Sequence, residues 1–201
     1  MESHEAANLF PLDEANIQSL ADDIKANGLQ VPIEVMGGKI LDGRRRFAAC
    51  GKVSVEPRFH EVNPADPVAY VLSLNLQRRQ LTSSQKAMVA ARVRDIYDRQ
   101  AAERMKAGKK DPPVKVPEGN TGDSRDLAGK AVGVNGKYVD QATKVIANAV
   151  PEVVKAVEEG RMNITAAALL SSEPAEVQRA EASSPKRKQR SKPKPSEPSK
   201  P

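Results

Sequence analysis

The sequence predicts an α+β protein in which a small α/β domain is followed by an all-α domain and a disordered basic tail. Within the first 62 of the 201 residues, a helix-like segment is followed by short apolar runs and glycine turns. From Ala65 to Leu170 the apolar residues recur at helical spacing instead. After Ser183 the chain consists of proline, serine, charged residues and one glutamine, which offer no large apolar side chain to a core.

The α/β domain is expected at residues 8–80. Apolar residues at helical spacing predict a helix over residues 13–27, and Gly28 follows where a left-handed C-terminal residue belongs. Short apolar runs separated by glycines then predict two strands, a second helix closed by Gly51, and a third strand. Their ranges are 29–35, 39–41, 44–50 and a part of 53–62. Pro32 places the first strand at a sheet edge or marks its start.

Helices are predicted from residue 67 onward. One covers residues 67–76, and a longer one begins at Thr82, whose side chain can form a capping box with Gln85. The longer helix, at residues 81–107, is expected to connect two domains, because the next segment, 108–124, is rich in proline and glycine and predicts a flexible linker. Beyond it the pattern predicts a helical domain at 125–172, with helices over 125–132, 136–148, 151–159 and 163–170, and then the tail at 183–201.

The net charge of +6 is located in the tail. Residues 183–201 contain seven Lys and Arg residues and one glutamate, so the other 182 residues hold 25 basic and 25 acidic side chains. Two interpretations of the tail remain open. It is either a solvated extension or an arm that binds phosphates non-specifically by counterion release.

Composition and patterning exclude several classes of protein. No apolar run reaches 18 residues and no signal-peptide pattern is present, so a cytoplasmic protein without a membrane partner is expected. One cysteine, Cys50, and two histidines cannot make an internal disulfide or a structural zinc site, and Cys50 is expected to pack as a small apolar residue. The sequence has no Walker loop and no recognisable nucleophile pattern, so catalytic residues stay unknown.

An arginine cluster is the first candidate binding site. Gly43, Arg44, Arg45 and Arg46 lie between a predicted strand and the first turn of a predicted helix. Exposed amides at a helix N-terminus and arginine side chains both bind phosphate. Cations at that end oppose the helix dipole, so three arginines there favour a bound anion, although a solvated first turn is the alternative.

A second candidate lies at the junction of two predicted helices. Asn75, Gln77 and Arg78 follow each other closely there. Their side chains can cap the helix ends, or they can reach toward a ligand held by the arginine cluster.

A third candidate is a helix-turn-helix pattern over residues 126–146. Gly129 precedes Gly133 by four residues, and the apolar Val139 follows Gly133 by six. Asn135 is placed to cap the second helix. The candidate DNA contacts are Asn135, Lys137, Tyr138, Gln141 and Lys144. An ordinary pair of antiparallel helices is the alternative.

Together these motifs resemble the ParB N-terminal domain of the partition-protein and sulfiredoxin superfamily, in its plasmid or mobile-element form. The second and third family boxes, Gly-Glu-Arg-Arg-x-Arg-Ala and Glu-Asn-x-Gln-Arg-x-x-Leu-Thr/Ser, are similar to the segments beginning at Gly43 and at Leu74. The first box, Gly-Leu-x-x-Pro-Ile, is matched by residues 28–33. The resemblance covers residues 12–85, and the helix-turn-helix pattern adds to it.

This resemblance implies a ParB/sulfiredoxin-like α/β domain and a helix-turn-helix domain that binds double-stranded DNA. It implies roles in chromosome or plasmid partition, plasmid maintenance or transcriptional regulation, and association with the nucleoid. Its implied partners are a ParA-type ATPase and a second copy of the chain in a homodimer. The implied ligand is CTP with magnesium, held by residues that match the family boxes. These are Gly43, Arg45, Arg46, Asn75, Gln77 and Arg78.

The sequence departs from the family boxes at two carboxylates. Arg44 replaces the glutamate implicated in nucleotide hydrolysis, and Leu74 replaces the glutamate that helps to hold the metal. Neither residue can act as a general base or ligate magnesium, which argues against nucleotide hydrolysis. A metal-dependent nuclease remains the alternative, because some members of the superfamily are described as nucleases. The acidic residues near the arginine cluster are Asp42, Glu56, Glu61 and Asp66.

Overall fold

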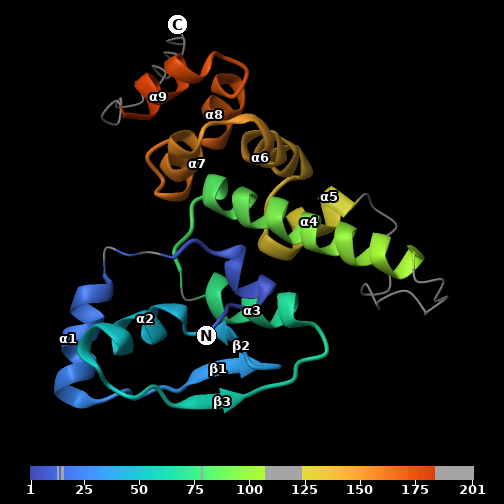
Figure 1. Cartoon of the computed structure of the whole chain (residues 1–201). Helices are drawn as coiled ribbons and strands as arrows, with labels where there is room; N and C mark the ends of the chain where they lie inside the picture. Colours follow the sequence, from blue (N-terminus) through green and yellow to red (C-terminus); the bar gives the residue numbers. More distant parts are fainter. Residues whose placement is uncertain (13, 15, 78, 107–123, 184–201) are drawn as a thin grey trace, which may run out of the picture.

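The structure is a computed structural model that describes residues 1–12, 14, 16–77, 79–106 and 124–183. It confirms the predicted α+β fold, with a small sheet and mostly helical structure (Figure 1). The predicted linker at 108–124 lies outside the described residues except for Ser124, and the predicted tail lies outside them except for Ser183. Among the described helices, none is both long and apolar enough to span a membrane.

The α/β part contains a three-stranded sheet with two helices beside it. Its elements, in chain order, are α1 (Ile17–Asn27), β1 (Ile33–Met36), β2 (Lys39–Asp42), α2 (Arg44–Val53) and β3 (Phe59–Glu61). The strand order is β2-β1-β3, with β1 antiparallel to β2 and parallel to β3. A register shift between Glu34 and Val35 interrupts the β1–β2 ladder. β1 begins directly after Pro32. This agrees with the predicted alternative in which the proline marks the start of the first strand.

The core of the α/β part lies between the sheet and the two helices. Ile17, Ala21 and Ile24 form the buried face of α1, and Ala49 and Cys50 form the buried face of α2. Both faces join a cluster with apolar residues of β1 and β2. The predicted packing role of Cys50 is thereby confirmed, and its burial raises the pKa of the thiol.

The helix α2 extends further than the sequence predicted. Gly51 does not close it, because the helix continues to Val53 and ends at Ser54, which adopts a left-handed conformation with φ of 53°. The backbone amide of Ser54 donates to the carbonyl of Cys50. Val53 packs against the core of the α/β part, and this tertiary contact favours the extra turn.

The N-terminal segment, for which the sequence predicted no element, adds to the edge of the sheet. The amide of His4 donates to the carbonyl of Ile40 over 2.8 Å, and the amide of Ile40 donates to the carbonyl of Glu2 over 2.9 Å. A short 3₁₀ helix, η1 (Glu5–Leu9), follows and buries Leu9. The outer edge of β2 is therefore covered by the start of the chain.

The helical part is built around the long helix α4. α3 (Pro67–Leu76) packs against η1 and β2. The elements of the helical part are α4 (Ser83–Lys106), α5 (Ser124–Val132), α6 (Gly136–Asn148), α7 (Pro151–Glu158), α8 (Ile164–Leu170) and α9 (Ala175–Ser183). In Figure 1, α4 lies between the α/β part and helices α6 to α9. The capping box that begins it forms as predicted, because the amide of Thr82 donates to Gln85 Oε1 and the amide of Gln85 donates to Thr82 Oγ1.

One core joins both ends of the molecule through α4. Met88, Val93 and Ile96 of α4 are buried in the same cluster as Leu9 and Leu41 on one side and the apolar residues of α5 to α9 on the other. α4 thus packs against the helices that follow it as well as against the N-terminal segment.

α9, the last helix within the described residues, was not predicted from the sequence. It is held by Gln178, whose side chain is buried and bonds to two backbone groups. Gln178 Oε1 accepts from the amide of Val150 over 2.9 Å, and Nε2 donates to the carbonyl of Glu173 over 2.8 Å. A buried polar anchor of this kind leaves no apolar periodicity in the sequence.

Candidate functional site

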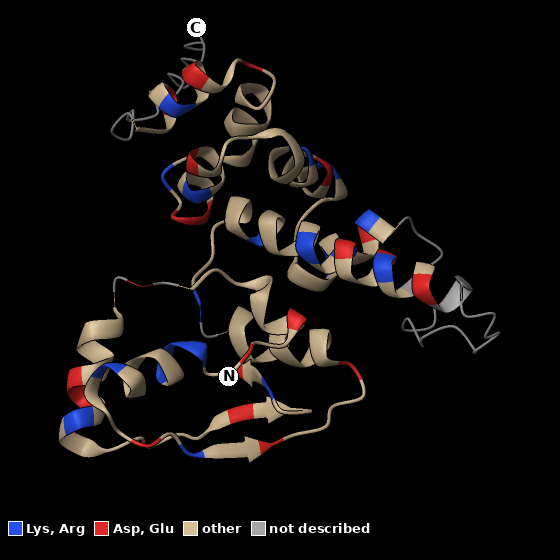
Figure 2. Cartoon of the chain, viewed as in Figure 1, with Lys and Arg blue, Asp and Glu red and all other residues tan. Residues whose placement is uncertain are grey.

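Three segments that are far apart in the sequence line one cavity of about 440 Å³. They are residues 28–31 after α1, residues 42–46 from the end of β2 into α2, and Asn75 of α3. These are the three segments that carry the ParB resemblance. The structure therefore brings the predicted glycine, arginine and asparagine residues together around a single space. Figure 2 shows the arginines as a blue stretch at the start of α2.

Gly43 allows the chain to turn from β2 into α2. It caps the helix in a left-handed conformation with φ of 98°. A Cβ atom at this position would lie 2.8 Å from Nη2 of Arg46, so the guanidinium of Arg46 lies directly against the glycine. The position thus requires glycine for its conformation, whereas the flexible end of the Arg46 side chain could move away from a Cβ atom.

Asp42 joins two of the predicted site residues. Its Oδ2 accepts from Arg46 Nη2 over 2.9 Å, and its Oδ1 accepts from Asn75 Nδ2 over 3.4 Å. Asn75 is only 3% exposed and also donates to the carbonyl of Val71. The sequence predicts Asp42 as the strand end before the arginine cluster and as one of the acidic residues of the nuclease alternative, and the structure adds its ion pair with Arg46.

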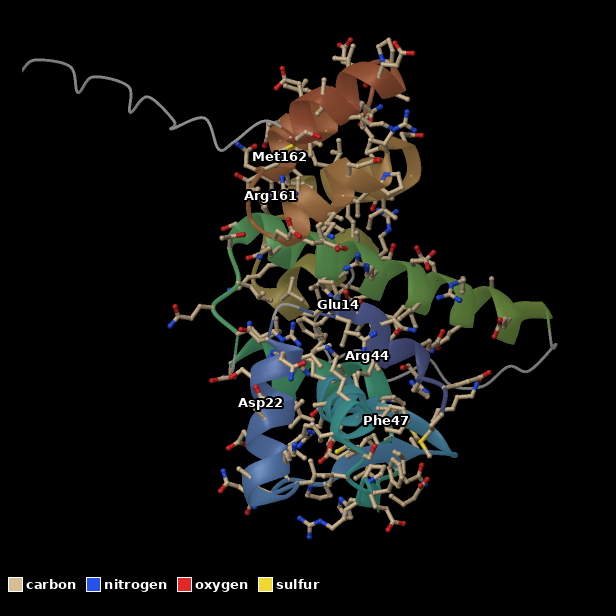
Figure 3. The ribbon with its side chains drawn as sticks, turned by 60° about the vertical axis from the view of Figure 1, so that its left-hand side comes forward. Glu14, Asp22, Arg44, Phe47, Arg161 and Met162 are labelled. Carbon is tan, nitrogen blue, oxygen red and sulfur yellow. The ribbon has the colours of Figure 1, made fainter. Side chains whose placement is uncertain are left out.

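Arg44 lines the cavity and also holds the N-terminal segment. Its Nη1 donates to Asn8 Oδ1 over 2.8 Å, and its Nη2 donates to the carbonyl of Phe10. Burial lowers the pKa of Arg44, nearby Arg92 lowers it further, and Asp42 acts in the opposite direction. In Figure 3 the label of Arg44 lies above that of Phe47, on the side of the α/β part that faces the helical part.

The remaining predicted residues of this site have different positions. Arg45 lines the cavity, whereas Gln77 is exposed at the end of α3 and is not among the lining residues. Arg78 lies outside the described residues. Arg79, which the sequence did not single out, lines the cavity and places its guanidinium 5.2 Å from the centre of the Phe10 ring.

The acidic residues of the nuclease alternative do not gather in one place. Asp66 caps α3 by accepting from the amides of Val68 and Ala69, and Glu61 accepts from the amide of Gly37. Glu56 is exposed, outside the cavity that Asp42 lines. Within the described residues, no group of three or more His, Cys, Asp or Glu side chains is placed to hold a metal ion. Nothing in this arrangement favours the nuclease alternative.

The two helices of the third candidate pack closely at their glycines. A Cβ atom on Gly129 would lie 2.7 Å from the carbonyl oxygen of Val134 and 3.3 Å from a methyl group of Val139. Gly133 has φ of 74° in the turn, and Val139 is fully buried. Asn135 Oδ1 accepts from the amide of Lys137 over 2.8 Å, so the predicted cap of α6 is confirmed.

The candidate DNA contacts lie along α6. Lys137, Tyr138 and Lys144 are exposed, and Gln141 is half-buried. Two of these side chains bond to α8 and to the turn after it. Thr165 Oγ1 of α8 donates to Gln141 Oε1 over 3.2 Å, and Lys144 Nζ donates to Ser172 Oγ over 2.8 Å. No sequence pattern indicated these bonds, since they depend on the packing of α8 against α6.

Comparison with known proteins gives no sequence family for the chain. No protein-family model matches it, and no curated protein sequence matches it significantly. Two solved structures of the C-terminally truncated chromosome-partitioning protein ParB from Caulobacter crescentus are similar to it, each at 15% identity. The complex with CTP-γ-S covers 90% of this chain and 91% of its own, with a TM-score of 0.33. The complex with the centromeric parS site covers 86% and 89%, with a TM-score of 0.34.

Proposed function

We propose that this chain is a ParB-like DNA-binding protein in which α5 and α6 form a helix-turn-helix. The observation that carries this proposal is the tight α5–α6 turn, in which Gly129 and Val139 are closely packed and Gly133 has the positive φ of a turn. This packing fixes α6 and leaves Lys137 and Tyr138 exposed. Their lysine and phenol groups can donate to base edges or phosphates in a major groove.

The charge balance of α6 supports DNA binding. The acidic residue of this helix, Asp140, forms ion pairs with Arg94 of α4 over 3.3 Å and with Arg125 of α5 over 3.0 Å. Its negative charge is therefore compensated within the protein, while Lys137 and Lys144 contribute positive charge to the same helix. A phosphate backbone that approaches α6 meets a net positive helix.

The cavity at the start of α2 is proposed to bind the phosphates of a nucleotide, with CTP and magnesium as the candidate ligand. Its volume lies in the range of small-molecule sites. The amides at the start of α2 and the side chains of Arg45 and Arg46 form a basic wall, and Leu20 and Ile24 form an apolar wall on α1. Arg44 and Leu74 supply no carboxylate, so binding without hydrolysis is expected.

The proposed setting is partition or maintenance of a plasmid or chromosome, or transcriptional regulation, on the nucleoid. One helix-turn-helix offers a limited interface, so two copies of the chain on a site with two-fold symmetry are expected. A ParA-type ATPase is the proposed partner in partition.

The DNA-binding proposal is tested by selecting bound duplexes from a random pool with the full chain. A recurring motif is expected, and replacement of Lys137 and Gln141 by Ala should weaken binding to it by about tenfold or more, since base contacts each contribute about 1–3 kcal/mol. Lys52→Ala on α2, which also removes an exposed lysine, is the matched control and should bind the motif normally. Absence of any selected motif would overturn the proposal.

The nucleotide proposal is tested by thermal unfolding with each of the four nucleoside triphosphates, with and without magnesium. A ligand that binds only the folded chain stabilises it by about 2.7 kcal/mol at a hundredfold excess over its Kd. We expect CTP to raise the unfolding midpoint and Arg45→Ala to remove the effect while the midpoint without ligand stays near that of the unmodified chain. Equal midpoints with and without every triphosphate would exclude nucleotide binding.

A further inference from the structure

The arginine site contains an anion of its own. Asp42 is the last residue of β2 and directly precedes Gly43, so its carboxylate lies at the N-terminal end of α2. This is where the backbone amides and the arginine side chains are arranged to hold a phosphate. The carboxylate of Asp42 accepts from one of these arginines, Arg46, whose guanidinium could otherwise bind a phosphate oxygen.

The contacts of Asp42 show which groups it occupies. Its two oxygens accept from Arg46 over 2.9 Å and from Asn75 over 3.4 Å. The Arg46 and Asp42 side chains are only 16% and 13% exposed, so water screens this ion pair weakly. Asp42 also acts electrostatically on Arg44, which lines the same cavity.

A second acidic residue on the same cavity does not share this arrangement. Asp23 belongs to α1, is exposed, and accepts a hydrogen bond from Asn27 on its own helix over 2.8 Å. Asp42 and Asp23 therefore differ in their contacts with the arginine cluster although both contribute a negative charge to one cavity.

We propose that Asp42 is an internal competitor for the phosphate site, whose carboxylate holds Arg46 and Asn75 until an incoming phosphate displaces it. This inference rests on the proposed phosphate site and adds the residue that regulates its affinity. The carboxylate keeps the arginine cluster in place in the free protein. It also weakens the binding of every phosphate, because the ligand must break the Asp42–Arg46 ion pair before it can use Arg46.

The test compares the affinity of inorganic triphosphate for the full chain and its variants by calorimetry, without divalent metal. Asp42→Asn keeps the size of the side chain, removes its charge and replaces one of its two acceptor oxygens by an NH2 donor. It should bind triphosphate about tenfold more tightly than the unmodified chain, as expected for release of one charge-assisted contact of about 1.5 kcal/mol. Asp23→Asn removes an equal charge from the same cavity and should change the affinity by less than about threefold, since exposed charges are screened.

Each outcome has a separate meaning. If Asp42→Asn binds triphosphate no more tightly than Asp23→Asn, the competitor role is wrong while the phosphate site stands. If, in a repeat of the titration with magnesium, the metal strengthens triphosphate binding to the unmodified chain and not to Asp42→Asn, Asp42 holds a metal with the ligand, and the competitor role is again wrong. If neither the unmodified chain nor Asp42→Asn binds, the proposed phosphate site itself fails. If Asp42→Asn does not give the circular dichroism spectrum of a folded chain, the same titration is made with Asp42→Ser, a second uncharged variant.

Discussion

Tyr97 shows how one side chain connects two helices of this protein. Its hydroxyl on α4 donates to Asp66 Oδ2 over 2.8 Å, while Asp66 Oδ1 caps α3 by accepting from two backbone amides. Burial raises the pKa of Tyr97 most strongly, and the hydrogen bond and negative charge of Asp66 raise it further. The phenol therefore stays protonated in the folded chain at pH values where it ionises in the unfolded chain.

Replacing this tyrosine should change both stability and its pH dependence. Because the pKa is raised on folding, the stabilisation is complete below about pH 10, where the unfolded phenol is still protonated, and is lost as the pH rises through the folded-state pKa. Tyr97→Phe should lower the free energy of unfolding by about 1 kcal/mol at neutral pH and reduce the loss above pH 10. Urea unfolding at neutral and alkaline pH measures both effects. An alkaline loss of equal size in the phenylalanine variant would contradict this account.

Two glycines offer a matched test of the close packing at the α5–α6 turn. A methyl group at Gly129 would meet the carbonyl of Val134 at 2.7 Å, whereas one at Gly51 inside α2 would meet no atom within 4 Å. Gly129→Ala should therefore destabilise the chain by about 1–3 kcal/mol through overpacking. Gly51→Ala should stabilise it by about 0.5–1 kcal/mol, because alanine loses less conformational entropy in a helix. Thermal unfolding of both variants checks the opposite signs, and a stabilised Gly129→Ala would show that the two helices do not cross as closely as described.

At the level of elements, Arg92 connects three parts of the chain. From α4 it donates to the carbonyl of Leu9 in η1 over 3.2 Å and forms an ion pair with Glu158 at the end of α7. Its side chain is 25% exposed and that of Glu158 is 15% exposed. The N-terminal segment and the helical part are therefore both attached to the same residue of α4.

Loss of this connection should cost more than loss of an exposed ion pair on the same helix. Arg92→Ala removes the cation that pairs with the largely buried carboxylate of Glu158. This loss should lower the free energy of unfolding by about 2 kcal/mol. Arg99→Ala removes an arginine that is 56% exposed and pairs with Asp95 and Glu5, and should cost less than about 1 kcal/mol. Chemical denaturation of both variants provides the comparison. Equal losses would mean that Arg92 does not link the two parts energetically.

Most elements could be predicted because their apolar residues repeat with the period of a helix or a strand. The helices α4 and α6 are examples, since each has a regular apolar face and a side-chain cap. α9 escaped prediction because its anchor is the polar residue Gln178, and its one large aliphatic residue, Val177, is 44% exposed. η1 escaped because its place depends on a pairing with β2, which lies more than thirty residues further along the chain.

The site could be predicted at the level of its segments and not at the level of its contacts. Glycine and arginine spacing identified the residues that line the cavity at the start of α2. The sequence did not reveal the roles of Asp42 and Arg79. An aspartate that precedes a glycine has no distinctive sequence pattern, and neither has an arginine in the segment between two helices. Their importance comes from partners that the fold brings near, namely Arg46 for Asp42 and Phe10 for Arg79.

At the level of the whole molecule, positive and negative side chains are interspersed over the described elements (Figure 2). This agrees with the sequence, in which the 182 residues before the tail contain equal numbers of acidic and basic side chains. Long-range attraction of the chain to a polyanion must therefore come mainly from the seven basic residues of the tail. Under the proposed function, α6 supplies the local contacts with DNA, while the tail adds charge without sequence information.

Removal of residues 184–201 should consequently weaken binding to all duplexes by the same factor. Each phosphate contact contributes about 0.9 to the slope of log affinity against log salt, so a tail that forms several contacts should flatten this slope by about 3 or more. Fluorescence anisotropy with the selected motif and with a scrambled duplex, over a range of salt concentrations, measures both quantities. A chain of full length in which Gln replaces the seven basic residues is the matched control and should behave like the truncated chain. If the salt slope is unchanged in both variants, the tail is a solvated extension, and all phosphate contacts belong to the folded part of the molecule.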